Sequence, residues 1–287
     1  MLSHAARGVL LDWSFEPVTI AGLALASGLY ARGLRRLWRD TGRGRVVAPW
    51  QAWSFWLGMA SLVVTLLSPL DTLGDELFAA HMTQHLVLIL ISAPLIVFGA
   101  PVLPVLWAFD RPTRQAIGRW WNHSTIVSTV AGVLTVPVIA WSIHVAAVWA
   151  WHLPGPYTAA LGSEWVHALE HLSFLGTAVL FWWVAFAPSG RRHLGYGMAI
   201  AYVLVAGMLF GILGAILTFA DHVWYPAQSS AAHLWGLTPL EDQQLAGIIM
   251  WVPSSFIYLA AASYLFVEWL RVERPEPAHG GEGWTGY

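Results

Sequence analysis

The sequence contains no cysteine and no lysine, and it has few charged residues of any kind. Without cysteine the chain has no disulfide framework, no thiolate metal site and no CxxC redox motif, so any metal must be held by other ligands. Only 10% of the 287 residues are charged and 57% are hydrophobic, whereas soluble domains are about a quarter charged. The formal net charge of -2 disfavours a nucleic-acid-binding surface. This composition excludes an ordinary water-soluble protein.

Apolar segments of about twenty residues recur along the chain, and each is long enough to cross a hydrocarbon core as a helix. We therefore predict an all-α, polytopic membrane protein. A single seven-helix transmembrane domain is expected over residues 1–270, followed by a short disordered cytoplasmic tail over 271–287. The predicted spans are 17–37, 50–70, 79–100, 126–150, 165–187, 197–220 and 244–269.

The arginines indicate an orientation for this bundle. Thirteen of the fourteen arginines follow the first, third, fifth or seventh predicted span, whereas Arg7 lies in the N-terminal tail. Loops rich in arginine remain on the cytoplasmic side of a membrane. We therefore expect the N-terminus outside, the C-terminus in the cytoplasm and the lipid bilayer around the seven spans.

The twelve histidines are many for so apolar a chain, and most gather on the predicted outer side. Eight lie in the outer half of a span or in an outer loop: His81, His85, His144, His152, His167, His171, His222 and His233. Two pairs are spaced by four residues, so each pair shares one face of its helix. These pairs are His81 with His85 and His167 with His171.

The predicted depths of these histidines favour a shared site. At about 1.5 Å per residue, His85, His144 and His171 would lie at similar depth, roughly 10 Å inside the outer boundary. A shallower layer would contain His81, His152, His167 and His222. Because imidazoles inside a membrane are costly unless paired or liganded, histidines at matched depth on three helices favour a metal site over isolated hydrogen bonds.

Imidazole ligands without thiolates suit copper, zinc, iron and nickel, and thioethers assist copper. Met82 lies between the paired histidines of the third span, and Met250 lies in the seventh. Since Met82 is about 100° from His81 around the helix, packing is its alternative role.

Two other functions use the same residues. The run from His167 to His171 matches the HxxEH pattern, in which two histidines bind zinc and the glutamate acts as base. This pattern describes a zinc-dependent membrane hydrolase using Glu170, whose alternative role is to orient a ligand histidine. A haem-binding protein is the other possibility, with histidines of the third and fifth spans as axial ligands.

Several short motifs occur in order between residues 50 and 270. They are His81-Met82-x-x-His85, Ala93-Pro94-Leu95, Gly99-Ala100-Pro101, Trp151-His152-Leu153-Pro154 with Tyr157, His167-x-x-Glu170-His171, and Asp242-Gln243-Gln244 with Gly247 and Trp251. Together they resemble the polytopic CtaG family, the assembly factors of caa3-type bacterial cytochrome c oxidases. The single-span, cysteine-bearing copper chaperone of the same name is excluded by the absence of cysteine.

The resemblance implies a non-enzymatic protein of the bacterial plasma membrane that is needed to form an active oxidase and helps copper reach the haem-copper centre. We expect oxidase subunits and an extracytoplasmic copper donor as partners. Carried over onto this sequence, the ligands are His81, His85, His152, His167 and His171. Depth in the membrane adds His144 and His222, and three residues are expected to support the ligands: Glu170, Met82 and Asp242.

Overall fold

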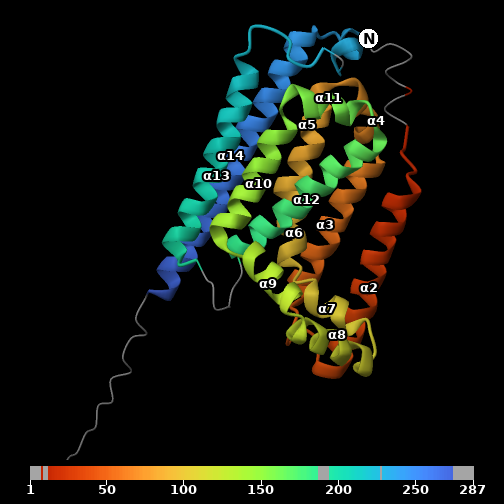
Figure 1. Cartoon of the computed structure of the whole chain (residues 1–287), viewed down its shortest axis with the longest axis vertical. Helices are drawn as coiled ribbons and strands as arrows, with labels where there is room; N and C mark the ends of the chain where they lie inside the picture. Colours follow the sequence, from red (N-terminus) through yellow and green to blue (C-terminus); the bar gives the residue numbers. More distant parts are fainter. Residues whose placement is uncertain (1–7, 9–11, 187–193, 227, 274–287) are drawn as a thin grey trace, which may run out of the picture.

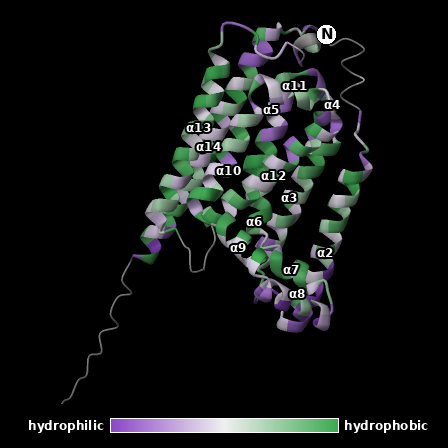
Figure 2. Ribbon diagram, viewed as in Figure 1, coloured by the Kyte–Doolittle hydropathy of each residue, from purple (hydrophilic) through white to green (hydrophobic). Residues whose placement is uncertain are grey.

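The computed structural model describes residues 8, 12–186, 194–226 and 228–273. Throughout these residues the regular structure is helical and no strand occurs, which confirms the predicted all-α class. The helices stand side by side in a bundle (Figure 1). Hydrophobic residues dominate along the helices, and hydrophilic residues gather toward the two ends (Figure 2).

Helices cover most of the described chain. Their bounds are α2 Pro17–Thr41, α3 Pro49–Leu67, α4 Pro69–Glu76, α5 Phe78–Val87, the π-helical turn η1 Leu88–Ser92, α6 Ala93–Phe98, α7 Val102–Trp107, α8 Arg111–His123, α9 Thr125–Leu134, α10 Pro137–Trp151, α11 Pro154–Leu161, α12 Glu164–Phe186, α13 Tyr196–Thr218, the 3-10 helix η2 Gln228–Trp235, and α14 Pro239–Val272.

Five helical segments are long and apolar enough to cross a membrane. They are α3, the run from α5 to α6, α12, α13 and α14. The pair α9 and α10 passes the same test jointly, although it is bent by 71°. The first predicted span coincides with α2, which is 25 residues long but carries four arginines in its second half. The predicted tail lies outside the described residues from residue 274 onward.

The bend in the fourth predicted span lies where Pro137 begins α10. Proline lacks the N–H that a helix needs there, and the residue before a proline avoids the helical conformation. Val136 accordingly has ψ of 124°, in the extended region. The segment therefore consists of two helices with different directions and is not one straight rod.

A second proline shapes the third span. In the π-helical turn η1, the N–H of Ala93 bonds to the carbonyl of Leu88, five residues earlier. The next residue, Pro94, has no N–H to offer to the carbonyl of Ile89. The indole N–H of Trp182 donates to that carbonyl instead, at 2.8 Å. A side chain of α12 therefore compensates for the missing backbone bond and joins α12 to the third span.

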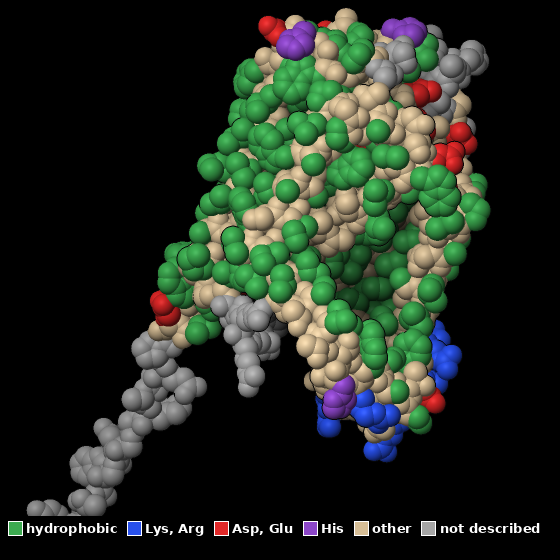
Figure 3. All heavy atoms as spheres, in the orientation of Figure 1, with side chains coloured by type: hydrophobic (Ala, Val, Ile, Leu, Met, Phe, Trp, Pro, Cys, Tyr) green, Lys and Arg blue, Asp and Glu red, His purple; other side chains and the backbone are tan. Residues whose placement is uncertain are grey.

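The charged side chains are distributed unevenly between the two ends of the bundle. Arginine side chains visible in Figure 3 gather at the end formed by α7 and α8. On α2, Arg36 donates a hydrogen bond to the carbonyl of Ala108 at 2.9 Å, which ties the arginine-rich end of α2 to the segment after α7. The opposite end of the bundle is formed by α4, α11 and the start of α14 (Figure 1).

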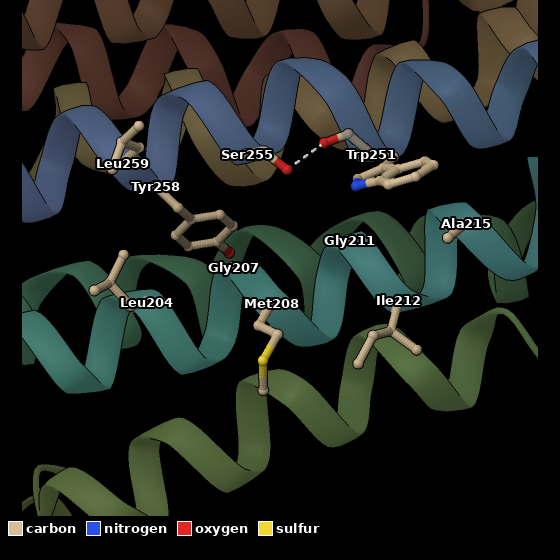
Figure 4. Close-up of a pocket in the computed structure, with 10 residues that line it drawn as sticks. All are labelled: Leu204, Gly207, Met208, Gly211, Ile212, Ala215, Trp251, Ser255, Tyr258 and Leu259. Carbon is tan, nitrogen blue, oxygen red and sulfur yellow. Dashed lines mark hydrogen bonds between the residues drawn. The ribbon is translucent and has the colours of Figure 1, made fainter.

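A groove of about 460 Å³ lies between α13 and α14. Its residues include Gly207, Gly211, Trp251 and Tyr258, and Figure 4 shows the side chains of Trp251 and Tyr258 between the two helices. The lining is largely apolar and contains neither a histidine nor an acidic residue. This groove therefore lacks the ligands that the sequence analysis selected.

The contact between α13 and α14 predicts that alanine substitutions at two glycines change the free energy of unfolding in opposite directions. A Cβ atom at Gly247 would lie 2.5 Å from the backbone nitrogen of Thr218, whereas one at Gly176 would meet nothing within 4 Å. Gly247→Ala should lower the free energy of unfolding by about 1–3 kcal/mol through overpacking. Gly176→Ala should raise it by about 0.5–1 kcal/mol. Thermal unfolding of the purified protein in detergent measures both, and equal midpoints would contradict the close approach.

Candidate metal centre

The two histidine pairs meet in the interior of the bundle. The ring centroids of His81 and His85 on α5 are 4.3 Å apart, and those of His167 and His171 on α12 are 4.2 Å apart. Across the two helices, the His81 and His167 rings are 5.3 Å apart, as are the His85 and His171 rings. The four-residue spacings therefore place the two pairs of imidazoles opposite each other, in one cluster.

Glu170 lies among these rings. Its Oε2 is 3.8 Å from Nε2 of His81, and its Oε1 is 3.8 Å from Nε2 of His85. One ligand atom from each of the three residues lies within 4.8 Å of the others. Ion–ligand bonds of roughly 2.0–2.2 Å at a tetrahedral angle place ligand atoms about 3.3–3.5 Å apart. A small inward movement of these side chains would bring all three onto one ion.

The polar atoms of the cluster are buried without hydrogen-bond partners. His81 and Glu170 are fully buried, and His85 is 3% exposed. Both ring nitrogens of each of these histidines and both carboxylate oxygens of Glu170 lack a partner among the described residues, as does Nε2 of His167 and of His171. Each such atom costs about 1–3 kcal/mol when unsatisfied. Their concentration in one place fits a transition-metal ion, which takes imidazole and carboxylate ligands.

The histidines of the cluster differ in how far they are buried. His167 and His171 are half-buried, whereas His85 lies deeper. At the rim, on α4, burial raises the pKa of the Asp75 carboxyl, nearby Asp71 adds to the rise, and His167 opposes it. The half-buried histidines therefore connect the surface near Asp75 with the buried ligands.

His152, which follows α10, is buried beside the cluster, although the sequence analysis placed it in a shallower layer. Its Nδ1 is 2.6 Å from the carbonyl oxygen of Val148, and its Nε2 is 3.2 Å from Sδ of Met82. Its ring centroid is 6.2 Å from that of His85. Met82 therefore contacts a candidate ligand, as expected of a supporting residue, and does so from a neighbouring helix.

Two of the predicted ligands lie elsewhere. Nδ1 of His144 is 3.0 Å from the hydroxyl of Thr177, and its ring packs against Phe181 at 4.9 Å. Because Thr177 is six residues beyond His171 on α12, His144 lies about 9 Å deeper than the matched depth predicted. His222 is exposed, and its Nδ1 is 2.5 Å from a carboxylate oxygen of Asp221.

Asp242 supports the cluster indirectly. This carboxylate is fully buried, and it accepts hydrogen bonds from the N–H of Phe78 at 2.8 Å and the N–H of Ala79 at 3.0 Å. These N–H groups begin α5 and have no partner within the helix. A side chain of α14 thereby fixes the start of the helix that carries His81 and His85.

The sequence analysis missed Tyr225 and Gln228, which together with Tyr157 close the site on one side. The hydroxyl of Tyr225 donates to the carbonyl of His152 at 2.5 Å, and the hydroxyl of Tyr157 donates to Oε1 of Gln228 at 2.8 Å. Burial raises the pKa of Tyr157 well above its ordinary value, so its hydroxyl remains a donor. Tyr157 belongs to one of the quoted motifs, but no periodicity identifies Tyr225 or Gln228.

A family model described as "Cytochrome c oxidase caa3 assembly factor (Caa3_CtaG)" matches residues 28–272. Among curated proteins, the uncharacterized protein MT0111 of Mycobacterium tuberculosis is 29% identical over 282 residues, which is 93% of this chain and 40% of that protein. The uncharacterized protein ML1998 of Mycobacterium leprae is 25% identical over 275 residues, with 90% and 40% covered. The chain thus spans less than half the length of these relatives. No solved structure matches it significantly.

The cap on α5 predicts a loss of stability when Asp242 is replaced. Asp242→Ala leaves the buried N–H groups of Phe78 and Ala79 without an acceptor, which should lower the free energy of unfolding by about 1–3 kcal/mol. Asp221→Ala is the matched control, because that side chain is 93% exposed and surface changes stay within about 0.5 kcal/mol. Thermal unfolding in detergent measures both, and an equal effect of the two substitutions would contradict the capping role.

Proposed function

The chain belongs to the Caa3_CtaG family of cytochrome c oxidase caa3 assembly factors, and from this premise we propose that it binds copper at His81, His85 and Glu170 and delivers it to an oxidase subunit. The observation that carries the proposal is the group of buried imidazole and carboxylate atoms that lack hydrogen-bond partners in the described residues. Such atoms are stabilised by an ion that accepts their lone pairs. Copper is the protein's cargo and does not stay with it.

The ligand types favour copper over the other metals that imidazole binds. Two neutral imidazoles and one carboxylate leave a single negative charge beside the ion. This limits the cost of burying charge in an interior of low dielectric constant. The chain has no cysteine to select zinc by thiolates, and the Met82 thioether lies within reach of His152. Thioether and imidazole together are typical ligands of copper.

The cluster lies toward the end of the bundle opposite the arginines. We propose that seven spans cross the plasma membrane: α2, α3, the run from α5 to α6, the bent pair α9 and α10, α12, α13 and α14. The arginine-rich end, with α7 and α8, is then cytoplasmic, and the end with α4 and α11 faces outward (Figures 1 and 3). This orientation puts the N-terminus outside and opens the histidine cluster to an extracytoplasmic copper donor.

Copper enters from the rim in this proposal. His167 and His171 are half-buried and their rings touch those of the buried pair, so an ion can exchange ligands step by step as it moves inward. Delivery to the oxidase subunit then occurs sideways within the bilayer or at its outer surface.

The geometry gives less support to the other two functions. Glu170 lies 3.8 Å from each of two histidine nitrogens, which is the position of a ligand more than that of a base beside a metal-bound water. A haem needs its macrocycle between two axial histidines, but the candidate rings contact one another directly, with centroids 4.2–5.3 Å apart. We therefore expect neither zinc-dependent hydrolysis nor a Soret band in the absorption spectrum of the purified protein.

Removal of the α5 ligands tests the copper site. His81→Ala combined with His85→Ala should lower Cu(II) affinity at least 100-fold and abolish caa3 oxidase activity in membranes of cells that carry only this variant. His222→Ala is the matched control, because this histidine is exposed and paired with Asp221. Copper affinity is measured by competition with a chromophoric chelator in detergent. Retention of wild-type affinity and oxidase activity in the double variant would refute the proposal.

Glu170 separates the ligand role from the catalytic one. Glu170→Gln removes the negative charge at the cluster. It should weaken binding of a divalent ion by roughly 10–100-fold, which is the usual effect of replacing a group that supports a metal site. Glu170→Asp keeps the charge and should lose less. A zinc hydrolase would show the opposite pattern, with metal retained and turnover lost in Glu170→Gln. Metal content and affinity of the two purified variants distinguish these outcomes.

A further inference from the structure

The contact between His152 and Met82 has an unusual arrangement of protons. The carbonyl oxygen of Val148 can only accept a hydrogen bond, so the nearby Nδ1 of His152, at 2.6 Å, carries the ring proton. In a neutral imidazole Nε2 then has a lone pair and no hydrogen. That lone pair faces Sδ of Met82 at 3.2 Å, and a thioether has no hydrogen either.

Two lone pairs face each other in this contact, so it is not a hydrogen bond between neutral groups. A second proton on the ring would turn it into one, but it would place a positive charge on a side chain that is 5% exposed. Within the described chain, the His152 ring contacts Met82, the Val148 carbonyl, His85 and Phe174. The carbonyl of His152 accepts from the Tyr225 hydroxyl. None of these partners is a carboxylate. A buried imidazolium without a counter-charge is costly.

The spacing of the two atoms fits two ligands of one metal ion. Metal bonds of about 2.0 Å to imidazole nitrogen and about 2.3 Å to sulfur, at a tetrahedral angle, place the ligand atoms about 3.5 Å apart. The observed 3.2 Å between Nε2 and Sδ is close to this value. The two side chains therefore need little movement to share an ion.

A small cavity adjoins this pair. It has a volume of about 10 Å³, which is close to the space needed for one water-sized sphere. Its lining contains Met82, Met250, His85 and His152, and the rest of it is apolar. Two methionines and two histidines, from α5, α14 and the turn after α10, thus line a space of the size of one ion.

We propose that Met82, Met250 and His152 form a second copper site that is selective for Cu(I). All three ligands are neutral and two are soft, which suits a monovalent soft ion and disfavours Cu(II) and Zn(II) in so apolar a place. The neighbouring site differs because Glu170 supplies a negative charge there. This inference rests on the proposed function for the identity of the cargo, and it adds a second ligand set and an oxidation state.

His85 connects the two sites. Its Nε2 is 3.8 Å from Glu170, its ring is 4.3 Å from that of His81, and the same side chain lines the cavity beside Met82. A Cu(I) ion can therefore pass from one site to the other without a change of oxidation state while His85 remains bound, so the ion is never without protein ligands during the step.

Full-length protein in detergent tests the second site. The double variant Met82→Leu, Met250→Leu nearly conserves volume, so the fold should be retained at a cost below about 1.5 kcal/mol per substitution. Cu(I) affinity, measured anaerobically by competition with bicinchoninate, should fall at least tenfold in this variant, and Zn(II) affinity should not change. Met208→Leu is the matched control, because Met208 lines the groove between α13 and α14, and it should alter neither affinity.

X-ray absorption of the wild-type protein loaded with one equivalent of Cu(I) gives a readout that needs no variant. Sulfur in the first coordination shell is expected, and a shell of nitrogen and oxygen alone would overturn the inference. Unchanged Cu(I) affinity in the methionine variant would overturn it as well. The histidine double variant keeps the two proposals apart. Loss of Cu(II) binding in that variant, together with unchanged Cu(I) affinity in the methionine variant, would leave the proposed function standing and overturn the second site. If the histidine double variant kept its Cu(II) affinity and the methionine variant lost Cu(I) affinity, the second site would stand and the proposed function would be refuted.

Discussion

A polar atom inside a helix bundle surrounded by lipid must find its partner within the protein, because no water competes for it. This constraint explains several contacts that otherwise look unrelated. Trp182 donates to a carbonyl that a proline leaves without a donor, and Asp242 accepts from the first N–H groups of α5. Against this background, the nitrogens and oxygens of His81, His85 and Glu170 are notable, because so many unpartnered atoms gather at one place among the described residues. A group of such atoms is what a binding site for an ion requires.

The residues of the quoted motifs divide into those that form the histidine cluster and those that fix the positions of the helices around it. In Asp242-Gln243-Gln244, the first residue caps α5. The side chain of Gln243 accepts from the N–H of Trp224 at 2.7 Å, and that of Gln244 donates to the carbonyl of Ala220 at 3.0 Å. This motif therefore contributes no ligand in the structure. It ties α14 to α5 and to the segment after α13, and so keeps the ligand helix in position.

The sequence predicted the fold class and the histidine cluster because both depend on local periodicity. Four-residue spacing determines a helix face whatever the surroundings, and it correctly paired His81 with His85. Depth proved harder to predict. It was counted inward from one outer boundary common to all spans, whereas the contact of His144 with Thr177 shows that α10 is displaced inward relative to α12. His152 is buried because the chain after α13 returns over it through Tyr225, a long-range contact that no spacing reveals.

The absence of cysteine has a consequence for the compartment in which such a site operates. Thiol ligands exposed to an oxidising environment are lost to disulfides unless a reductant restores them. Imidazoles do not undergo this reaction, and the sulfur of a methionine is oxidised only to a sulfoxide. Met82 is fully buried and Met250 is 5% exposed, so oxidants have little access to them. A metal centre built from these ligands stays ready through folding alone, with no thiol reductase to maintain it.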